Sequence, residues 1–118
     1  MNSKLVVSVL LVILVLFGTA IFLTRAPAAP SNLDSFAKCL ADKGVTMYGA
    51  AWCSHCQNQK KLFGTSFQYV PYIECPNVPK ICVEKGVDGY PTWIIGDTKL
   101  EGEQTLSKLS EISSCQLP

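Results

Sequence analysis

The order of apolar and polar positions divides the chain into three parts. Leu5 to Leu23 reads LVVSVLLVILVLFGTAIFL, a run of 19 residues without a charged side chain. As a helix that rises about 1.5 Å per residue it would be roughly 28 Å long, close to the hydrocarbon thickness of a bilayer. The next stretch, RAPAAPS, is rich in proline and alanine and has no periodicity. We therefore predict a membrane anchor or signal segment at 1–24, a spacer at 25–31 and one folded domain at 32–118.

Within the predicted domain the pattern alternates between helical and strand-like periods. The stretch SNLDSFAKCLADKG begins with a capping pattern at Ser31 and Asp34, places apolar residues on one helical face, and ends at Gly44. The elements that follow are a buried strand, a helix, a strand, a short helix, a hairpin and a helix capped by Thr105, at 45–51, 53–63, 67–75, 79–86, 92–102 and 105–115. This order predicts an α/β fold, a mixed sheet of about four strands with helices on both faces. Pro71 cannot donate to a ladder, so the strand at 67–75 should be an edge strand or a bulged strand.

The apolar run near the N-terminus has two interpretations. A cleaved signal peptide has an apolar core of about 7 to 15 residues followed by small residues. Gly18-Thr19-Ala20 could be such a cleavage site, but Ile21-Phe22-Leu23 continues the apolar run beyond it. We therefore favour an uncleaved, single-pass anchor, with Lys4 on the cytoplasmic side and the domain outside the cytoplasm. The alternative is a secreted or periplasmic domain released after signal cleavage.

Charge and cysteine content narrow the function classes. Ten basic residues against nine acidic residues leave no basic surface that would indicate nucleic-acid binding. All six cysteines lie in the predicted domain. An even number of cysteines in a small exported domain indicates disulfides and an oxidising compartment.

The most informative motif is Trp52-Cys53-Ser54-His55-Cys56 at the start of a predicted helix. Unpaired N–H groups and the positive end of the helix dipole favour a thiolate at Cys53. Spacing of three residues brings Cys56 to the same side, where it can resolve a mixed disulfide. His55 is expected to stabilise the Cys53 thiolate and so make the disulfide a better oxidant.

Two other interpretations of this motif are a zinc site and a structural disulfide. A zinc site would need four ligands, for which Cys75 and Cys82 would have to join the first pair, at a spacing that zinc sites do not favour. A purely structural bridge between Cys53 and Cys56 would close a very small loop and stabilise the fold little. We therefore predict a redox-active pair without a bound metal, and no cofactor other than that disulfide.

The motif WCSHC followed by GYPTW at 89–93 resembles the two signatures of the thioredoxin superfamily. More closely, the stretch from MYGAAWCSHC to LEGEQTL is similar to the thioredoxin-like domain attached to bacterial homologues of vitamin K epoxide reductase. The resemblance implies a minimal thioredoxin-like fold. It also implies that Pro91 is a cis-proline facing the cysteine pair, that the backbone of Tyr90 pairs with an extended substrate, and that Trp52 shields the nucleophile. One departure is Met47, which stands where many relatives carry a buried acid.

The remaining four cysteines allow three pairings. Cys75 and Cys82 bracket a short loop, and we pair them. Cys39 and Cys115 would then close a long loop and hold the last helix in place. Both bridges are predicted to be structural, with an electron-relay role for Cys75–Cys82 as the alternative.

These observations predict a membrane-tethered thiol–disulfide oxidoreductase outside the cytoplasm that oxidises client protein thiols. The resemblance implies a separate, quinone-linked membrane oxidase of the vitamin K epoxide reductase type as the partner that regenerates the disulfide. Two alternatives remain: a reductase or isomerase that receives electrons from the membrane, and a non-catalytic module that binds zinc or a partner.

Overall fold

The structure is a computed structural model that describes residues 2–23 and 32–118, with side chains for 2–19 and 32–118. The predicted spacer at 25–31 and the predicted cap at Ser31 lie outside these residues. Helix α1, Ser3–Leu23, occupies the predicted apolar segment. No helix in the part of the chain that the structure describes is both long enough and apolar enough to cross a membrane. The membrane anchor at 5–23 stays a prediction.

The domain is built on a four-stranded mixed sheet, as the sequence predicts. The strands are β1 Thr46–Gly49, β2 Tyr72–Glu74, β3 Thr92–Ile95 and β4 Thr98–Glu101, in the order β2-β1-β3-β4. β1 runs parallel to β2 and antiparallel to β3, and β3 and β4 form the predicted hairpin. In the described residues α2 comes directly before β1, so the sheet lacks a strand beyond β2, and β2 is an edge strand.

The predicted strand at 67–75 is wrong in its first half. Gly64–Tyr69 forms a 3-10 helix, η1, and only three residues pair as β2. The ring of Phe67 packs edge-on against the rings of Phe63 and Tyr72, at centroid distances of 6.0 and 5.8 Å. Its apolar character therefore reflects packing on the core rather than strand alternation. Pro71 accepts a hydrogen bond from the Met47 N–H (2.9 Å), a contact that needs no N–H from proline.

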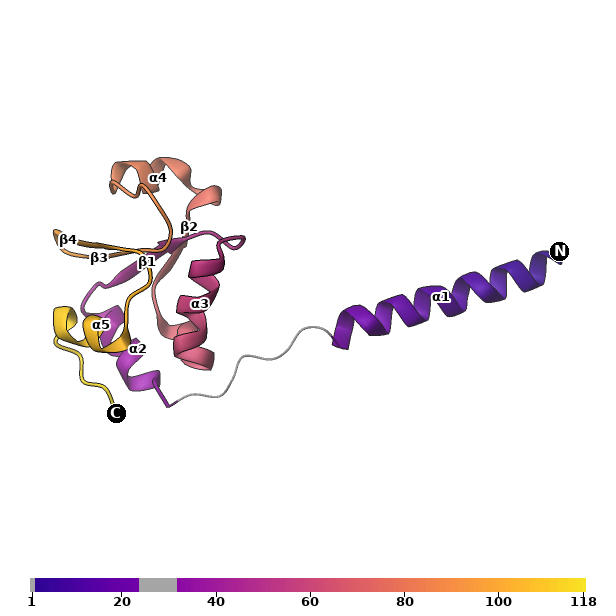
Figure 1. Cartoon of the computed structure of the whole chain (residues 1–118), viewed down its shortest axis with the longest axis horizontal. Coiled ribbons are helices and arrows are strands. Elements are labelled where there is room, and N and C mark those ends of the chain that lie inside the picture. The colour runs from indigo at the N-terminus through magenta and orange to yellow at the C-terminus, as the bar shows by residue number, and fades with distance from the viewer. Residues whose placement is uncertain (1, 24–31) are drawn as a thin grey trace.

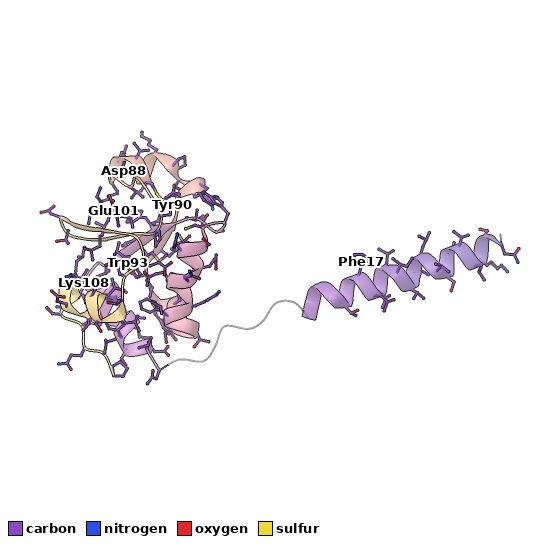
Figure 2. All side chains as sticks on the ribbon, in the orientation of Figure 1. Phe17, Asp88, Tyr90, Trp93, Glu101 and Lys108 are labelled. Carbon is purple, nitrogen blue, oxygen red and sulfur yellow. A yellow bond between two sulfur atoms is a disulfide. The ribbon has the colours of Figure 1, made fainter. Side chains whose placement is uncertain are left out.

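Helices cover both faces of the sheet, as predicted (Figure 1). One face carries α2 Asp34–Asp42, α3 Ser54–Phe63 and α5 Leu106–Ser113, and the other carries η2 Cys75–Asn77 and α4 Pro79–Glu84. Successive residues of β1 point to opposite faces. Met47 and Trp93 lie in the larger core with Phe36, whereas Tyr48 lies in the smaller core under α4. Figure 2 shows Trp93 on the side of the sheet that α5 covers.

Two disulfides hold the ends of the domain, and they join the pairs expected from the sequence. Cys39 in α2 is bonded to Cys115 after α5, across 76 residues. In the chain-entropy model a loop of that length stabilises the fold by about 4 kcal/mol. Cys75 is bonded to Cys82, which closes the η2–α4 segment. The predicted cap of α5 is also present, because Thr105 Oγ1 accepts the N–H of Lys108 at 3.1 Å.

Candidate active site

Cys53 lies where the loop after β1 meets the start of α3. Its N–H donates to the carbonyl of Ala50 (3.1 Å), and this tight turn makes Cys53 the N-cap residue of the helix. The Cys53 Sγ accepts the backbone N–H of Cys56 at 3.2 Å. The sulfur that the sequence identifies as the nucleophile therefore has a hydrogen-bond donor from the helix terminus directed at it.

Cys56 lies one turn into α3 and is the deeper of the two thiols. Cys56 is 0% exposed and Cys53 is 7% exposed, and neither cysteine is in a disulfide. Burial, together with its hydrogen bond to Cys53, raises the pKa of Cys56 to about 12. Cys56 therefore keeps its proton at neutral pH, as expected of a thiol that acts second.

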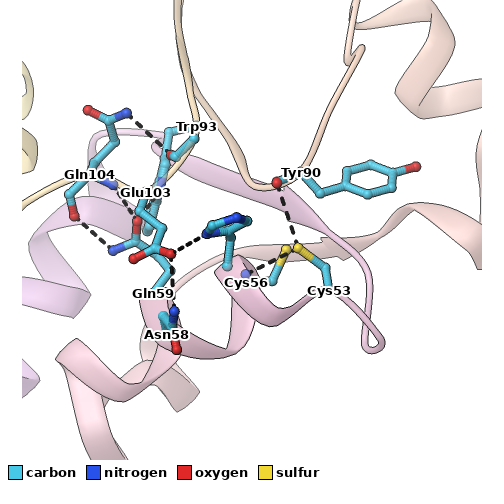
Figure 3. Close-up of polar contacts among 10 residues, drawn as sticks. Cys53, Cys56, Asn58, Gln59, Tyr90, Trp93, Glu103 and Gln104 are labelled. Atoms are coloured by element: carbon cyan, nitrogen blue, oxygen red, sulfur yellow. Dashed lines mark hydrogen bonds and ion pairs between the residues drawn. The ribbon is translucent and has the colours of Figure 1, made fainter.

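The turn before β3 brings Tyr90 and Pro91 over the nucleophile. The Tyr90–Pro91 peptide bond is cis, as the resemblance implies. The Cys53 thiol donates to the carbonyl of Tyr90 at 3.6 Å, as Figure 3 shows. The hydroxyl of Thr92 donates to the carbonyl of Gly89 (2.8 Å) and holds the turn.

A surface groove opens above Cys53 between this turn and the loop after β1. Its lining residues are Trp52, Cys53, Ser54, His55, Asp88, Gly89 and Tyr90. Trp52 is 75% exposed and meets the ring of Tyr90 edge-on, with centroids 5.9 Å apart. The two rings form an aromatic wall on which an extended peptide could lie next to the sulfur.

His55 has a different partner from the one that the sequence suggests. Its Nδ1 lies 2.7 Å from Glu103 Oε1, and Glu103 also accepts from Asn58 Nδ2 at 3.2 Å. The hydrogen bond from His55, and then that from Asn58, lowers the pKa of the Glu103 carboxyl. Among the described residues, no hydrogen bond or ion pair joins His55 to Cys53. The tuning role of His55 stays a prediction.

Sequence reasoning also missed the polar residues of β2 beside the pair. Glu74 accepts the N–H of Ala51 at 2.8 Å and the hydroxyl of Tyr72 at 2.6 Å, and so fixes the loop before Cys53. The hydrogen bond from Tyr72 lowers the pKa of Glu74, whereas burial and the same bond raise the pKa of Tyr72. The ammonium of Lys60 lies 3.8 Å from the centre of the Tyr72 ring.

Gly49, at the end of β1, allows this cluster to approach Cys56. A Cβ at that position would lie 2.9 Å from Cys56 Sγ and 3.2 Å from the Tyr72 hydroxyl. A side chain at this position would therefore collide with both the thiol and the Tyr72 ring, so the close packing requires glycine. Met47, at the position of the missing buried acid, is fully buried in the larger core.

The zinc alternative does not fit this arrangement. Cys75 and Cys82 are bonded to each other, so neither can act as a ligand together with Cys53 and Cys56. Across the described part of the chain, no three His, Cys, Asp or Glu side chains gather as metal ligands would.

Comparison with known proteins agrees with the fold. No family model matches the chain. It is 37% identical over 110 residues to thiol-disulfide oxidoreductase LTO1 of Arabidopsis thaliana, an alignment that covers 86% of this chain and 28% of that protein. The chain thus spans little more than a quarter of that relative's length. The crystal structure of thioredoxin NaTrxh from Nicotiana alata superposes with a TM-score of 0.51 at 15% identity, over 80% of this chain and 98% of that one. The chain has a thioredoxin-like fold, as the sequence predicts.

Proposed function

We propose that the chain is a protein thiol–disulfide oxidoreductase that passes the Cys53–Cys56 disulfide to client thiols. The observation that carries the proposal is the geometry of the pair. Cys53 caps a helix at the floor of a groove, and Cys56 lies one turn deeper with its pKa raised to about 12. The similarity to a protein named thiol-disulfide oxidoreductase supports the same chemistry.

The exchange proceeds in two steps that balance in electrons. A client thiolate attacks Cys53 Sγ, the Cys53–Cys56 bond breaks, and Cys56 leaves as a thiolate that takes up a proton. A second client thiolate then attacks the client sulfur of the mixed disulfide and releases Cys53. The client loses two electrons and gains a disulfide, and the pair becomes a dithiol. Once released, Cys56 is protonated at neutral pH because its pKa is raised, and a protonated thiol does not attack the mixed disulfide to reverse the step.

The groove suits an extended client segment rather than one particular sequence. Backbone pairing beside Tyr90 and Pro91 would read main chain, as strand addition does, and the ring of Trp52 would cover the neighbouring side chain. We therefore propose that the clients are diverse reduced, unfolded proteins.

We further propose that the domain works outside the cytoplasm on a membrane tether. The uncharged run at 5–23 and the two structural disulfides support this location. In this proposal a separate quinone-linked membrane oxidase of the vitamin K epoxide reductase type regenerates the disulfide. Release of the domain by signal cleavage is the alternative.

A reductase or isomerase remains a second candidate function, because His55 pairs with Glu103. A positive imidazole near Cys53 would favour the oxidase direction, and a carboxylate at 2.7 Å offsets that charge. The reduction potential distinguishes the two directions. A value near −120 mV would indicate a strong oxidant, and one near −270 mV a reductase.

The proposal is tested with the full chain and a reduced, unfolded client protein. Cys53→Ser should abolish client oxidation, whereas Cys56→Ser should accumulate client mixed disulfides on Cys53. Ser107→Ala, on the exposed surface of α5, serves as the control and should behave like the unmodified chain. Client oxidation that persists in Cys53→Ser would refute the proposed function.

A further inference from the structure

The loop between β4 and α5 is attached to α3 by one buried amide. Gln59 is 0% exposed, and its Oε1 accepts both the indole N–H of Trp93 (3.2 Å) and the N–H of Gln104 (2.6 Å). Its Nε2 donates to the carbonyl of Gln104 at 2.9 Å. Figure 3 shows Gln59 between Trp93 and the Gln104 backbone. Both backbone groups of Gln104 are thus held by a side chain that lies one turn after Cys56.

This attachment places the neighbouring residue, Glu103, on the exposed side of the same helix. Its Oε1 is shared by His55 Nδ1 at 2.7 Å and Asn58 Nδ2 at 3.2 Å, two side chains three positions apart on α3. The side chain of Glu103 is 36% exposed and that of His55 is 70% exposed. Because its pKa is lowered, Glu103 is negatively charged at neutral pH.

We propose that Glu103 is a positioning residue for the redox pair: by holding the His55 imidazole at its own carboxylate, it makes the Cys53–Cys56 disulfide a weaker oxidant. The inference rests on the proposed thiol–disulfide exchange. An imidazolium near Cys53 stabilises the thiolate and hence the dithiol, which raises the reduction potential. Glu103 Oε1 holds the imidazole at 2.7 Å on the exposed side of α3, and among the described residues no hydrogen bond joins His55 to Cys53. The imidazole is thereby kept from a stabilising contact with the sulfur. The other charged residue that lines the groove, Asp88, lies 3.7 Å from Lys99, which offsets its charge.

The test is the equilibrium of the full chain with glutathione, read as the fraction of the pair that is reduced. Glu103→Gln keeps the shape of the side chain and removes its charge. The equilibrium constant should shift about two- to fivefold toward the dithiol at low ionic strength, the size typical of exposed ion pairs. The shift should shrink in about 1 M salt, where the Debye length is about 3 Å. Glu111→Gln removes a more exposed carboxylate that is paired with Lys108 on α5; it is the control and should leave the equilibrium unchanged.

A double-mutant cycle separates an effect through His55 from a general effect of charge. In a His55→Ala background, Glu103→Gln should shift the equilibrium by less than half as much as in the unmodified chain. An unchanged equilibrium, a shift toward the disulfide, or an equal shift with and without His55 would each overturn the inference. If the unmodified chain itself reached no reversible equilibrium with glutathione, the proposed function would fail as well. A reversible unmodified chain with an unmoved Glu103→Gln variant would overturn this inference alone.

Discussion

Alkylation of Cys56 measures how strongly the fold holds the proton of the deeper thiol. Only a thiolate reacts with iodoacetamide at a useful rate, so the rate follows the ionised fraction. Burial and the bond to Cys53 raise the pKa of Cys56 from 9.0 to about 12. Three units correspond to an ionised fraction about 1,000-fold smaller at neutral pH than for an unshifted thiol. Exclusion of the reagent from a fully buried sulfur would slow the reaction further.

The Cys53→Ser variant makes the measurement clean. The other four cysteines are in disulfides, so Cys56 is its only free thiol, and serine is a good helix N-cap. The substitution removes the hydrogen bond between the thiols but leaves burial, the larger cause of the shift. Alkylation of the folded variant should therefore be at least about 100-fold slower than in urea with the disulfides intact.

The pH dependence gives the test its sharpest outcome. The rate for the folded variant should still rise about tenfold per pH unit above pH 9, because burial alone keeps the pKa of Cys56 above its ordinary value. In urea the rate should level off near pH 9. A plateau near pH 9 in the folded state, or a rate within tenfold of that in urea, would show that the fold does not hold the proton of Cys56. The assignment of Cys56 as the protonated leaving group would then be wrong.

Three further predictions concern stability. Gly49→Ala places a Cβ 2.9 Å from Cys56 Sγ, so overpacking of about 1–3 kcal/mol should lower the Tm by at least about 4 °C. The control is Gly89→Ala, whose Cβ meets nothing within 4 Å and should leave the Tm unchanged. Equal melting temperatures of the two variants would contradict the packing argument. The folded pKa of Cys56 is above its unfolded value, so its contribution to stability is complete below about pH 9 and is lost as the pH rises toward 12. Urea midpoints should therefore fall more steeply with pH above 9 for the dithiol than for the Cys53–Cys56 disulfide, and parallel slopes would count against it. The pKa of Glu74 is lowered, so its contribution to stability is present above pH 4.5 and is lost as the pH falls through the folded pKa. Glu74→Gln should therefore make the free energy of unfolding fall less steeply with decreasing pH below 4.5. An unchanged pH dependence in that range would exclude a stabilising role of the Glu74 carboxylate.

Much of the fold was predictable because its signals are local. A Gly-Asp turn between two strand-like runs predicts the hairpin at β3–β4. Thr105 before a helical period predicts α5. The wrong prediction of a strand over the whole of 67–75 also comes from reliance on local signals. A row of aromatic and β-branched residues satisfies the strand pattern, but Phe67 reaches the core from a 3-10 turn. That choice depends on the rings of Phe63 and Tyr72, which a local pattern does not contain.

The candidate site divides in the same way. Cys53, Cys56 and Pro91 belong to two short motifs, WCSHC and GYPTW, whose residue types indicate thiol–disulfide exchange. Gln59 and Glu103 carry no such motif and look like ordinary polar surface residues in the sequence. One signal was present: Cys56, Gln59 and Phe63 share the buried face of α3, so a polar residue stood on the inner side of the helix. A buried amide requires partners, and those partners are Trp93 on β3 and the backbone of Gln104, 34 and 45 residues away.

The direction of electron flow cannot be read from a histidine between two cysteines alone. The motif states which atoms react, but the potential depends on every charge near the sulfurs in both redox states. Here His55, on the exposed side of α3, contacts a carboxylate from the β4–α5 loop. Cys56, on the buried side, is influenced by the ammonium of Lys60, whose charge lowers the pKa of Cys56 while burial raises it. The two influences come from different parts of the fold and act on different sulfurs. Chains with the same five-residue motif can therefore oxidise or reduce their clients, according to what the neighbouring elements place on each side of this helix.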